Sequence, residues 1–211
     1  LEIDDFAPRI SFFFACHNNI LEEISKFRAA RELWYELINE EFNINNPKSA
    51  QLRFHTQTSG VTLTAQQPMN NSIRVAFQAL SAILGGTQSL HTNSYDEAIG
   101  LPSEDAVKIA LRTQQILAEE SGIVEYQDPL GGSYVVESMT NDLITKSRNI
   151  IDEIDSNGGA LKCMKMGLQQ KMIHDSAWKQ MRNFEEGRDR IVGVNIHNDD
   201  NNEHIEGQIL D

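Results

Sequence analysis

Apolar residues follow two patterns along the chain, short continuous runs and three- to four-residue intervals, and these patterns predict the order of the first strands and helices. The apolar run 10–16 is typical of a strand buried on both faces of a parallel sheet. Residues 19–41 place apolar side chains at three- and four-residue intervals, which predicts a long amphipathic helix. We expect a second strand at 51–57 and a second helix at 69–84, which ends where Gly85 begins a Gly-Gly pair.

The rest of the chain is predicted to be mainly helical. Residues 87–92 are a third short strand candidate, and Ser103 is a favourable N-cap for a helix that runs to residue 121. After a Gly-containing turn, the sequence predicts an extended piece at 133–136 and two further helices, at 140–156 and 160–184.

The order strand, helix, strand, helix, strand, helix predicts an α/β fold with a parallel sheet and crossover helices. Two architectures remain open on pattern alone. One is an open doubly wound sheet with further strands that the pattern does not reveal. The other is an eight-stranded barrel, which needs roughly 250 residues and cannot be complete in a chain of 211.

Charge and composition exclude several classes of function. The chain carries 18 Lys and Arg against 31 Asp and Glu, a net charge of −13, which disfavours nucleic acid and anionic lipid as partners. No stretch approaches the ~18–20 apolar residues of a membrane span. Cys16 and Cys163 form no C-x-x-C pair, so we expect a reducing compartment such as the cytoplasm. Because the acidic N-terminus lacks an initiator Met, we expect a piece of a longer protein.

The second predicted strand carries the strongest candidate chemistry. A period of two places Arg53, His55 and Gln57 on one face of it. One interpretation is an edge strand with a solvated face. The other is a polar face that lines a cavity at the carboxyl ends of parallel strands, where βα proteins bind ligands. Gly60, in the Thr-Ser-Gly continuation, favours the cavity, because glycine lets a backbone approach a large ligand closely.

Other candidates are weaker by themselves. Arg9 and Ser11 stand at the start of the first strand, and a guanidinium with a hydroxyl suits a phosphate, although a surface Arg paired with one of the 31 acidic residues is the commoner explanation. His91 lies in a polar run at 85–93, where a structural role is the common one, and Glu97 follows it. Zinc-helix, nucleophile-elbow and phosphate-loop motifs are absent from the sequence.

Five segments in order, PRISFFFA, EISKFRAARELW, RFHTQTSG, GGTQSLHTNSYDEA and DPLGGSYVVE, resemble the methylmalonyl-CoA mutase family of adenosylcobalamin-dependent acyl-CoA mutases. The resemblance implies a TIM (β/α)8 barrel, of which this chain would hold about the last three strands and their helices, followed by extra helices. It implies the last strands and helices of the barrel at 1–136, a C-terminal helical extension at 137–196, and an acidic tail or linker at 197–211.

The resemblance also implies roles for the candidate residues. Arg9 and Ser11 match positions that hold coenzyme A, whereas His55 and Gln57, with Arg53 on the same face, match the catalytic substrate cavity. The residues implied to bind the cofactor are Gly60, Glu97, Ala98 and His91. Two departures from the family pattern, Val61 after Thr-Ser-Gly and Leu130 in DPLGG, affect expected packing details.

The implied reaction is a radical rearrangement of an acyl-CoA carbon skeleton, with (R)-methylmalonyl-CoA to succinyl-CoA as the first choice and an isobutyryl-CoA-type mutase as the alternative. The cofactor would be adenosylcobalamin. Its cobalt ligand would come from a domain outside this chain, because no His here stands in the family's D-x-H-x-x-G motif, and we expect no metal-binding residue. A eukaryotic source would imply the mitochondrial matrix instead of the cytoplasm.

The implied partners are the acyl-CoA, a cobalamin-binding domain or subunit, the remaining barrel strands, and a second chain in a dimer or heterodimer. The isolated piece is expected to be inactive. A rival hypothesis makes this chain a non-catalytic split-barrel fragment that acts only by assembling with a partner, since a part-barrel leaves sheet edges open. A third makes it a remnant without a function.

Overall fold

The computed structural model describes residues 2–198, which divide into two compact units between Ile144 and Thr145. The first unit contains the sheet and its helices. The second contains the C-terminal part of one long helix and the two helices that follow it. The domain boundary expected after residue 136 stays a prediction, and residues 199–211 of the expected tail lie outside the described residues.

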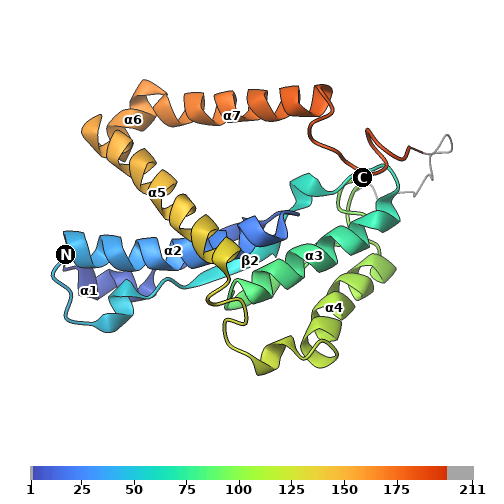
Figure 1. The fold of residues 1–211 in the computed structure, drawn as a ribbon, viewed down its shortest axis with the longest axis horizontal. Coiled ribbons are helices and arrows are strands. Elements are labelled where there is room, and N and C mark those ends of the chain that lie inside the picture. Colours follow the sequence, from blue (N-terminus) through green and yellow to red (C-terminus); the bar gives the residue numbers. More distant parts are fainter. Residues whose placement is uncertain (1, 199–211) are drawn as a thin grey trace. The chain divides into compact units, whose positions relative to one another are not determined.

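Three parallel strands in the order β1-β2-β3 form the sheet. The central strand, β2, is labelled in Figure 1. They are β1 (Phe12–Cys16), β2 (Phe54–Thr58) and β3 (Ser89–His91). The crossover helices are α2 (Ile20–Glu41) and α3 (Asn71–Leu84), and α4 (Glu104–Glu119) follows β3. Consecutive β/α units with neighbouring parallel strands are the repeating unit of a TIM barrel, so the predicted α/β class and part-barrel architecture are confirmed.

One face of the sheet is buried under helices, and the other carries polar residues. Phe27 of α2 is fully buried between the rings of Phe14 and Phe54, at centroid distances of 6.0 and 5.3 Å. Ala82 of α3 belongs to the same core. Alternate strand residues point away from this core, and they include His55 and its neighbours on the polar face. The helices therefore fix the sheet from one side.

The chain also forms short elements between the main ones. The α-helix α1 spans Ile3–Phe6, and 3-10 turns lie at Ala7–Arg9, Pro47–Ala50, Gly60–Thr62, Pro68–Asn70 and Ile123–Glu125. The pattern did not predict α1, which is held by tertiary contacts: Asp4 accepts hydrogen bonds from Ser49 Oγ at 2.6 Å and Asn45 N at 2.7 Å. The hydrogen bond from Ser49 is the largest cause of a lowered pKa for Asp4, and the bond from Asn45 lowers it further.

The expected extended piece at 133–136 is wrong, because residues from Tyr134 onward belong to α5 (Tyr134–Ser156). The β-branched Val135 and Val136 favour a strand, but Val136 is buried and its carbonyl accepts from Ser25 of α2 at 3.4 Å. Glu137 in the first turn also pairs with Arg28 of α2 at 2.7 Å. Tertiary contacts with α2 thus stabilise a helix where local propensity indicated a strand.

The last predicted helix, 160–184, consists of two helices. They are α6 (Ala160–Met166) and α7 (Leu168–Glu185), separated by Gly167 at a φ of 77°. A left-handed φ ends the first helix, and glycine adopts it without a Cβ clash. Between residues 2 and 198, no helix combines the length and apolar character that crossing a membrane requires.

Replacing Gly85 with Ala is expected to destabilise the first unit by about 1–3 kcal/mol through overpacking. A Cβ at this position would lie 2.5 Å from Cδ2 of the buried Phe27 ring, and the φ of −78° adds no backbone strain. The loss should appear as a lower urea midpoint. In a Phe27→Leu background the same change should cost clearly less, since the ring edge is gone; equal costs in both backgrounds would rule out the steric explanation.

Candidate functional site

The centre of the polar sheet face holds His55, in register with Phe13 of β1 and Ser89 of β3. His55 Nδ1 and Ser89 Oγ are 2.7 Å apart and share a hydrogen bond. The Phe13 ring flanks the imidazole at a centroid distance of 5.1 Å. These two contacts fix the imidazole from both neighbouring strands, and they leave Nε2 as the nitrogen available to a ligand.

Gln57 lies one pleat further along β2, at the carboxyl end of the sheet. Its Nε2 donates to Asn93 Oδ1 at 2.8 Å, and Asn93 in turn donates its backbone N–H to Thr58 Oγ1 at 2.8 Å. Because the amide group of Gln57 donates to Asn93, its Oε1 remains as an acceptor. Asn93 therefore orients Gln57 from the loop that follows β3.

Asn93 belongs to this candidate site by its geometry, although it is not among the residues predicted from the sequence. It is 2% exposed, and among the described residues its Nδ2 has no hydrogen-bond partner. A Cβ on Gly60 would lie 3.1 Å from this Nδ2 and 3.5 Å from Cγ of Glu97. Gly60, Asn93 and Glu97 thus form a close cradle that a larger side chain at position 60 would fill. The only feature of the sequence that points to Asn93 is the polar run at 85–93, which also contains His91.

The remaining cofactor candidates lie beside this cradle. His91 is the register partner of Gln57 and is exposed. With Glu97 it lines a pocket of about 260 Å³ against α4. Ala98 is exposed and lies with Glu97 in the turn at 95–99. Asp96 of the same turn accepts a hydrogen bond through Oδ2 from the N–H of Ser103 at 2.8 Å.

Arg9, Ser11 and Arg53 lie at the opposite end of the same face. Arg9 ends the 3-10 turn before β1, Ser11 directly precedes β1, and Arg53 directly precedes β2; all three are exposed. At ~3.3 Å per residue, the five-residue strands separate these side chains from the Gly60 cradle by roughly 16 Å. The structure therefore brings the candidates together in two groups, and a ligand that reaches both must be elongated.

The donor set of the cradle fits the implied cofactor. The cradle offers an unpartnered buried amide N–H, a carboxylate and an open Cα surface, which suit the hydroxyl and amide groups that surround a corrin ring and its adenosyl group. In the part of the chain that the structure describes, no three His, Cys, Asp or Glu residues cluster as metal ligands.

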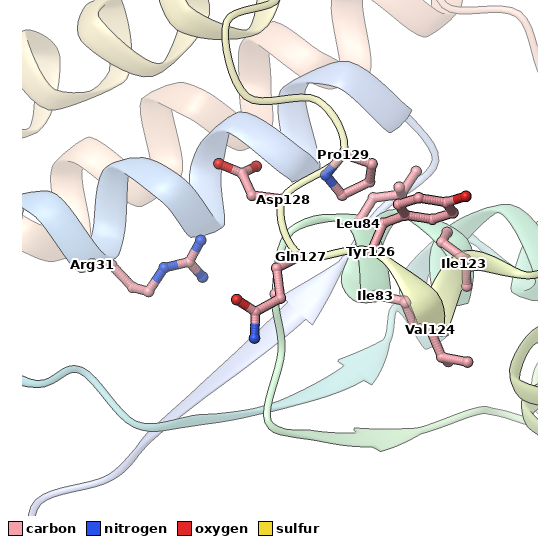
Figure 2. A pocket seen from close by; sticks show the side chains of 10 residues that line it. Arg31, Ile83, Leu84, Ile123, Val124, Tyr126, Gln127, Asp128 and Pro129 are labelled. Carbon is pink, nitrogen blue, oxygen red and sulfur yellow. The ribbon is translucent and has the colours of Figure 1, made fainter.

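A larger pocket, of about 390 Å³, lies at the amino end of the strands and contains none of the predicted site residues. Figure 2 shows Arg31 of α2 extending toward Gln127 and Asp128, and Tyr126 and Leu84 line the same pocket. Arg31 donates to the carbonyl of Gly85 at 2.7 Å, and burial lowers the pKa of its guanidinium.

Comparison with known proteins tests the predicted resemblance directly. The family model for methylmalonyl-CoA mutase matches residues 1–211. The large subunit of 2-hydroxyisobutanoyl-CoA mutase from Aquincola tertiaricarbonis is 48% identical over 195 residues, which cover 92% of this chain and 35% of that protein. Mitochondrial methylmalonyl-CoA mutase from Homo sapiens is 45% identical over 211 residues, covering 100% of this chain and 28% of that protein.

Methylmalonyl-CoA mutase from Escherichia coli is 47% identical over 195 residues, with 92% of this chain and 27% of that protein covered. The chain therefore spans only about a quarter to a third of the length of these curated relatives. Since the family model covers the whole sequence and the relatives match it nearly from end to end, the chain belongs to the methylmalonyl-CoA mutase family.

Proposed function

We propose that this chain forms part of the catalytic barrel of an adenosylcobalamin-dependent acyl-CoA mutase that converts (R)-methylmalonyl-CoA to succinyl-CoA. The observation that carries the proposal is the pair of hydrogen bonds on the polar sheet face, His55 to Ser89 and Gln57 to Asn93, in a chain of this family. By their names, the relatives above act on methylmalonyl-CoA and 2-hydroxyisobutanoyl-CoA, which are both acyl-CoA thioesters.

His55 and Gln57 would orient the reacting acyl group. With Ser89 bound to Nδ1, His55 can donate from Nε2 to the thioester carbonyl oxygen, and this donation stabilises charge on that oxygen. Gln57 can accept a hydrogen bond through Oε1, because Asn93 holds its amide group. Neither role moves a proton, so the site needs no paired base and nucleophile.

Gly60, Asn93 and Glu97 would hold the cofactor at the carboxyl end of the sheet. When bound, adenosylcobalamin supplies the radical centre that removes a hydrogen atom from the substrate and returns it. The cradle residues would bind polar groups of the cofactor and exclude water from the face that carries His55 and Gln57.

Arg9, Ser11 and Arg53 would bind the distal part of the substrate. A guanidinium and a hydroxyl match the phosphates of coenzyme A, and they supply local positive charge in a chain with a net charge of −13. The roughly 16 Å between this group and the Gly60 cradle suits a ligand that extends along the strands. Arg53, two residues before His55 on the same face of β2, would be the side chain of this group that is nearest along the strand to the acyl group.

The proposed activity needs more than this chain. Beyond β1 and β3, no further strand pairs with the sheet among residues 2–198, so both edges are open to other barrel strands. We propose that those strands, a cobalamin-binding domain or subunit that supplies the cobalt ligand, and a second chain complete the enzyme. The cytoplasm, or the mitochondrial matrix of a eukaryote, is the proposed compartment.

The test is an assay of the complete protein that carries this chain, with adenosylcobalamin and, in parallel, methylmalonyl-CoA, isobutyryl-CoA and 2-hydroxyisobutanoyl-CoA. Succinyl-CoA from the first substrate is the expected product. Turnover of isobutyryl-CoA alone would assign the alternative mutase. Failure to bind adenosylcobalamin and to turn over any of the three would leave the non-catalytic assembly role as the better description.

A further inference from the structure

Gln78 of α3 is fully buried, yet its side chain contacts two loops at the carboxyl end of the sheet. Its Oε1 accepts from the backbone N–H of Ser59 at 3.0 Å, in the loop after β2. Its Nε2 donates to Thr62 Oγ1 at 2.6 Å in that same loop, and to Asn18 Oδ1 at 2.6 Å in the loop after β1. One amide thus joins α3 to both loops.

The network requires an amide at position 78. Thr62 commits its only hydroxyl proton to the carbonyl of Ser59 at 2.7 Å, so Thr62 Oγ1 can only accept from residue 78. The Ser59 N–H, in contrast, donates to Gln78 Oε1 at 3.0 Å and is shared with the carbonyl of Cys16 at 2.8 Å, so residue 78 must present an acceptor toward it. A side chain that serves both must present an oxygen and an N–H at the same place. Gln satisfies this condition, whereas an ionised Glu of equal shape offers acceptors alone.

The segment that Gln78 holds carries the cofactor cradle. Gly60 lies between Ser59 and Thr62, and its Cα faces Asn93 and Glu97 in the loop after β3. A shift of the 59–62 segment by a few tenths of an ångström would change the approach of Gly60 to Asn93 Nδ2, where only 3.1 Å separates that nitrogen from a Cβ position. Gln78 therefore sets where Gly60 lies relative to the loop after β3, although Gln78 itself contacts neither Asn93 nor Glu97.

We propose that Gln78 is a positioning residue: its buried amide sets the position of the loops after β1 and β2, and through Gly60 it sets the shape of the cradle for the cofactor. This inference rests on the proposed function, since the cradle matters only if it binds the cofactor. Gln78 itself contacts no ligand in this scheme and acts through Ser59 and Thr62.

The test compares Gln78→Glu with the parent in the complete protein, with adenosylcobalamin binding followed by equilibrium dialysis. We expect the substitution to weaken cofactor affinity by about tenfold or more, because Thr62 loses its donor in a buried site. The turnover number at saturating cofactor should change much less. Gln88→Glu is the matched control: Gln88 bonds to Phe54 N at 2.9 Å at the amino end of the strands, so its variant should keep the parent affinity.

A second pair of variants covers the case in which Gln78→Glu does not fold. Thr62→Val removes the hydroxyl from a half-buried side chain and should weaken cofactor affinity in the same way, whereas Thr62→Ser should restore it. In cofactor-free samples of Gln78→Glu and Thr62→Val, amide hydrogen exchange should be faster than in the parent in the loops at 17–19 and 59–63, and it should be unchanged in β1 and β2. Faster exchange throughout the sheet would mean a general structural role and would overturn the proposal.

The two proposals fail in different ways. If the parent protein binds no adenosylcobalamin, the proposed function fails, whatever the variants do. If the parent binds it and both Gln78→Glu and Thr62→Val bind it equally well, the positioning role of Gln78 is wrong and the proposed function stands.

Discussion

Replacing Phe27 with Ala is expected to destabilise the first unit by about 3–5 kcal/mol, the range for removing a large buried aromatic side chain. Phe27 is fully buried, stacks on Phe54 with an interplanar angle of 14°, and meets Phe14 edge to face. The truncation would remove contacts with two strands at once. Because a domain is typically stable by only about 5–15 kcal/mol, the loss would be a large share of the total.

Amide hydrogen exchange of the complete protein measures this loss locally, in peptides that cover α2, β1 and β2. Tyr35→Ala is the matched control, because Tyr35 lies on the same helix and is 59% exposed. That variant should change protection by about 0.5 kcal/mol or less. Equal protection in Phe27→Ala and the parent would mean that the cluster around Phe27 does not hold α2 on the sheet.

The sequence predicts the β/α units well because their periodicities are strong. The strand at 10–16 and the helix at 19–41 are observed as β1 and α2 with boundary differences of a few residues. The errors fall where local preference and tertiary contact disagree. Val136 favours a strand, but its contacts with α2 stabilise a helix there. The helix α1 depends on Asp4 and Ser49, which are distant in sequence.

Part of the candidate site can be proposed from the sequence alone. A period of two or a family motif marks His55, Gln57 and Glu97, and their roles stay a prediction. Asn93 and Gln78 are not found, because their roles depend on which atoms remain unpartnered once the loops meet. In the sequence of the helix, Gln78 is simply a polar residue with apolar neighbours on both sides, and nothing marks its side chain as buried. Hydrogen-bond roles across loops become visible only in three dimensions.

His55→Ala is expected to lower kcat of the complete enzyme by about 10²–10³, the usual cost of losing one preorganised donor to a developing charge. Ser89 and Phe13 hold the imidazole in place, so its donor is oriented before substrate binds. Ser89→Ala keeps the imidazole but frees its ring, and we expect a smaller loss of about tenfold. Steady-state turnover of the acyl-CoA, at saturating cofactor, measures both.

The order of these two losses distinguishes an orienting role for His55 from general disruption of the sheet. His174→Ala removes an exposed imidazole from α7, in the second unit, and should retain parental kcat. Cofactor affinity should stay within about twofold in all three variants, because His55 precedes Gly60 by five residues and it is Gln57, one pleat further along β2, that bonds to Asn93 of the cradle. If Ser89→Ala costs as much as His55→Ala, the serine takes part directly. If neither lowers kcat, the polar face does not carry the reaction, and the substrate must be oriented by residues outside this chain.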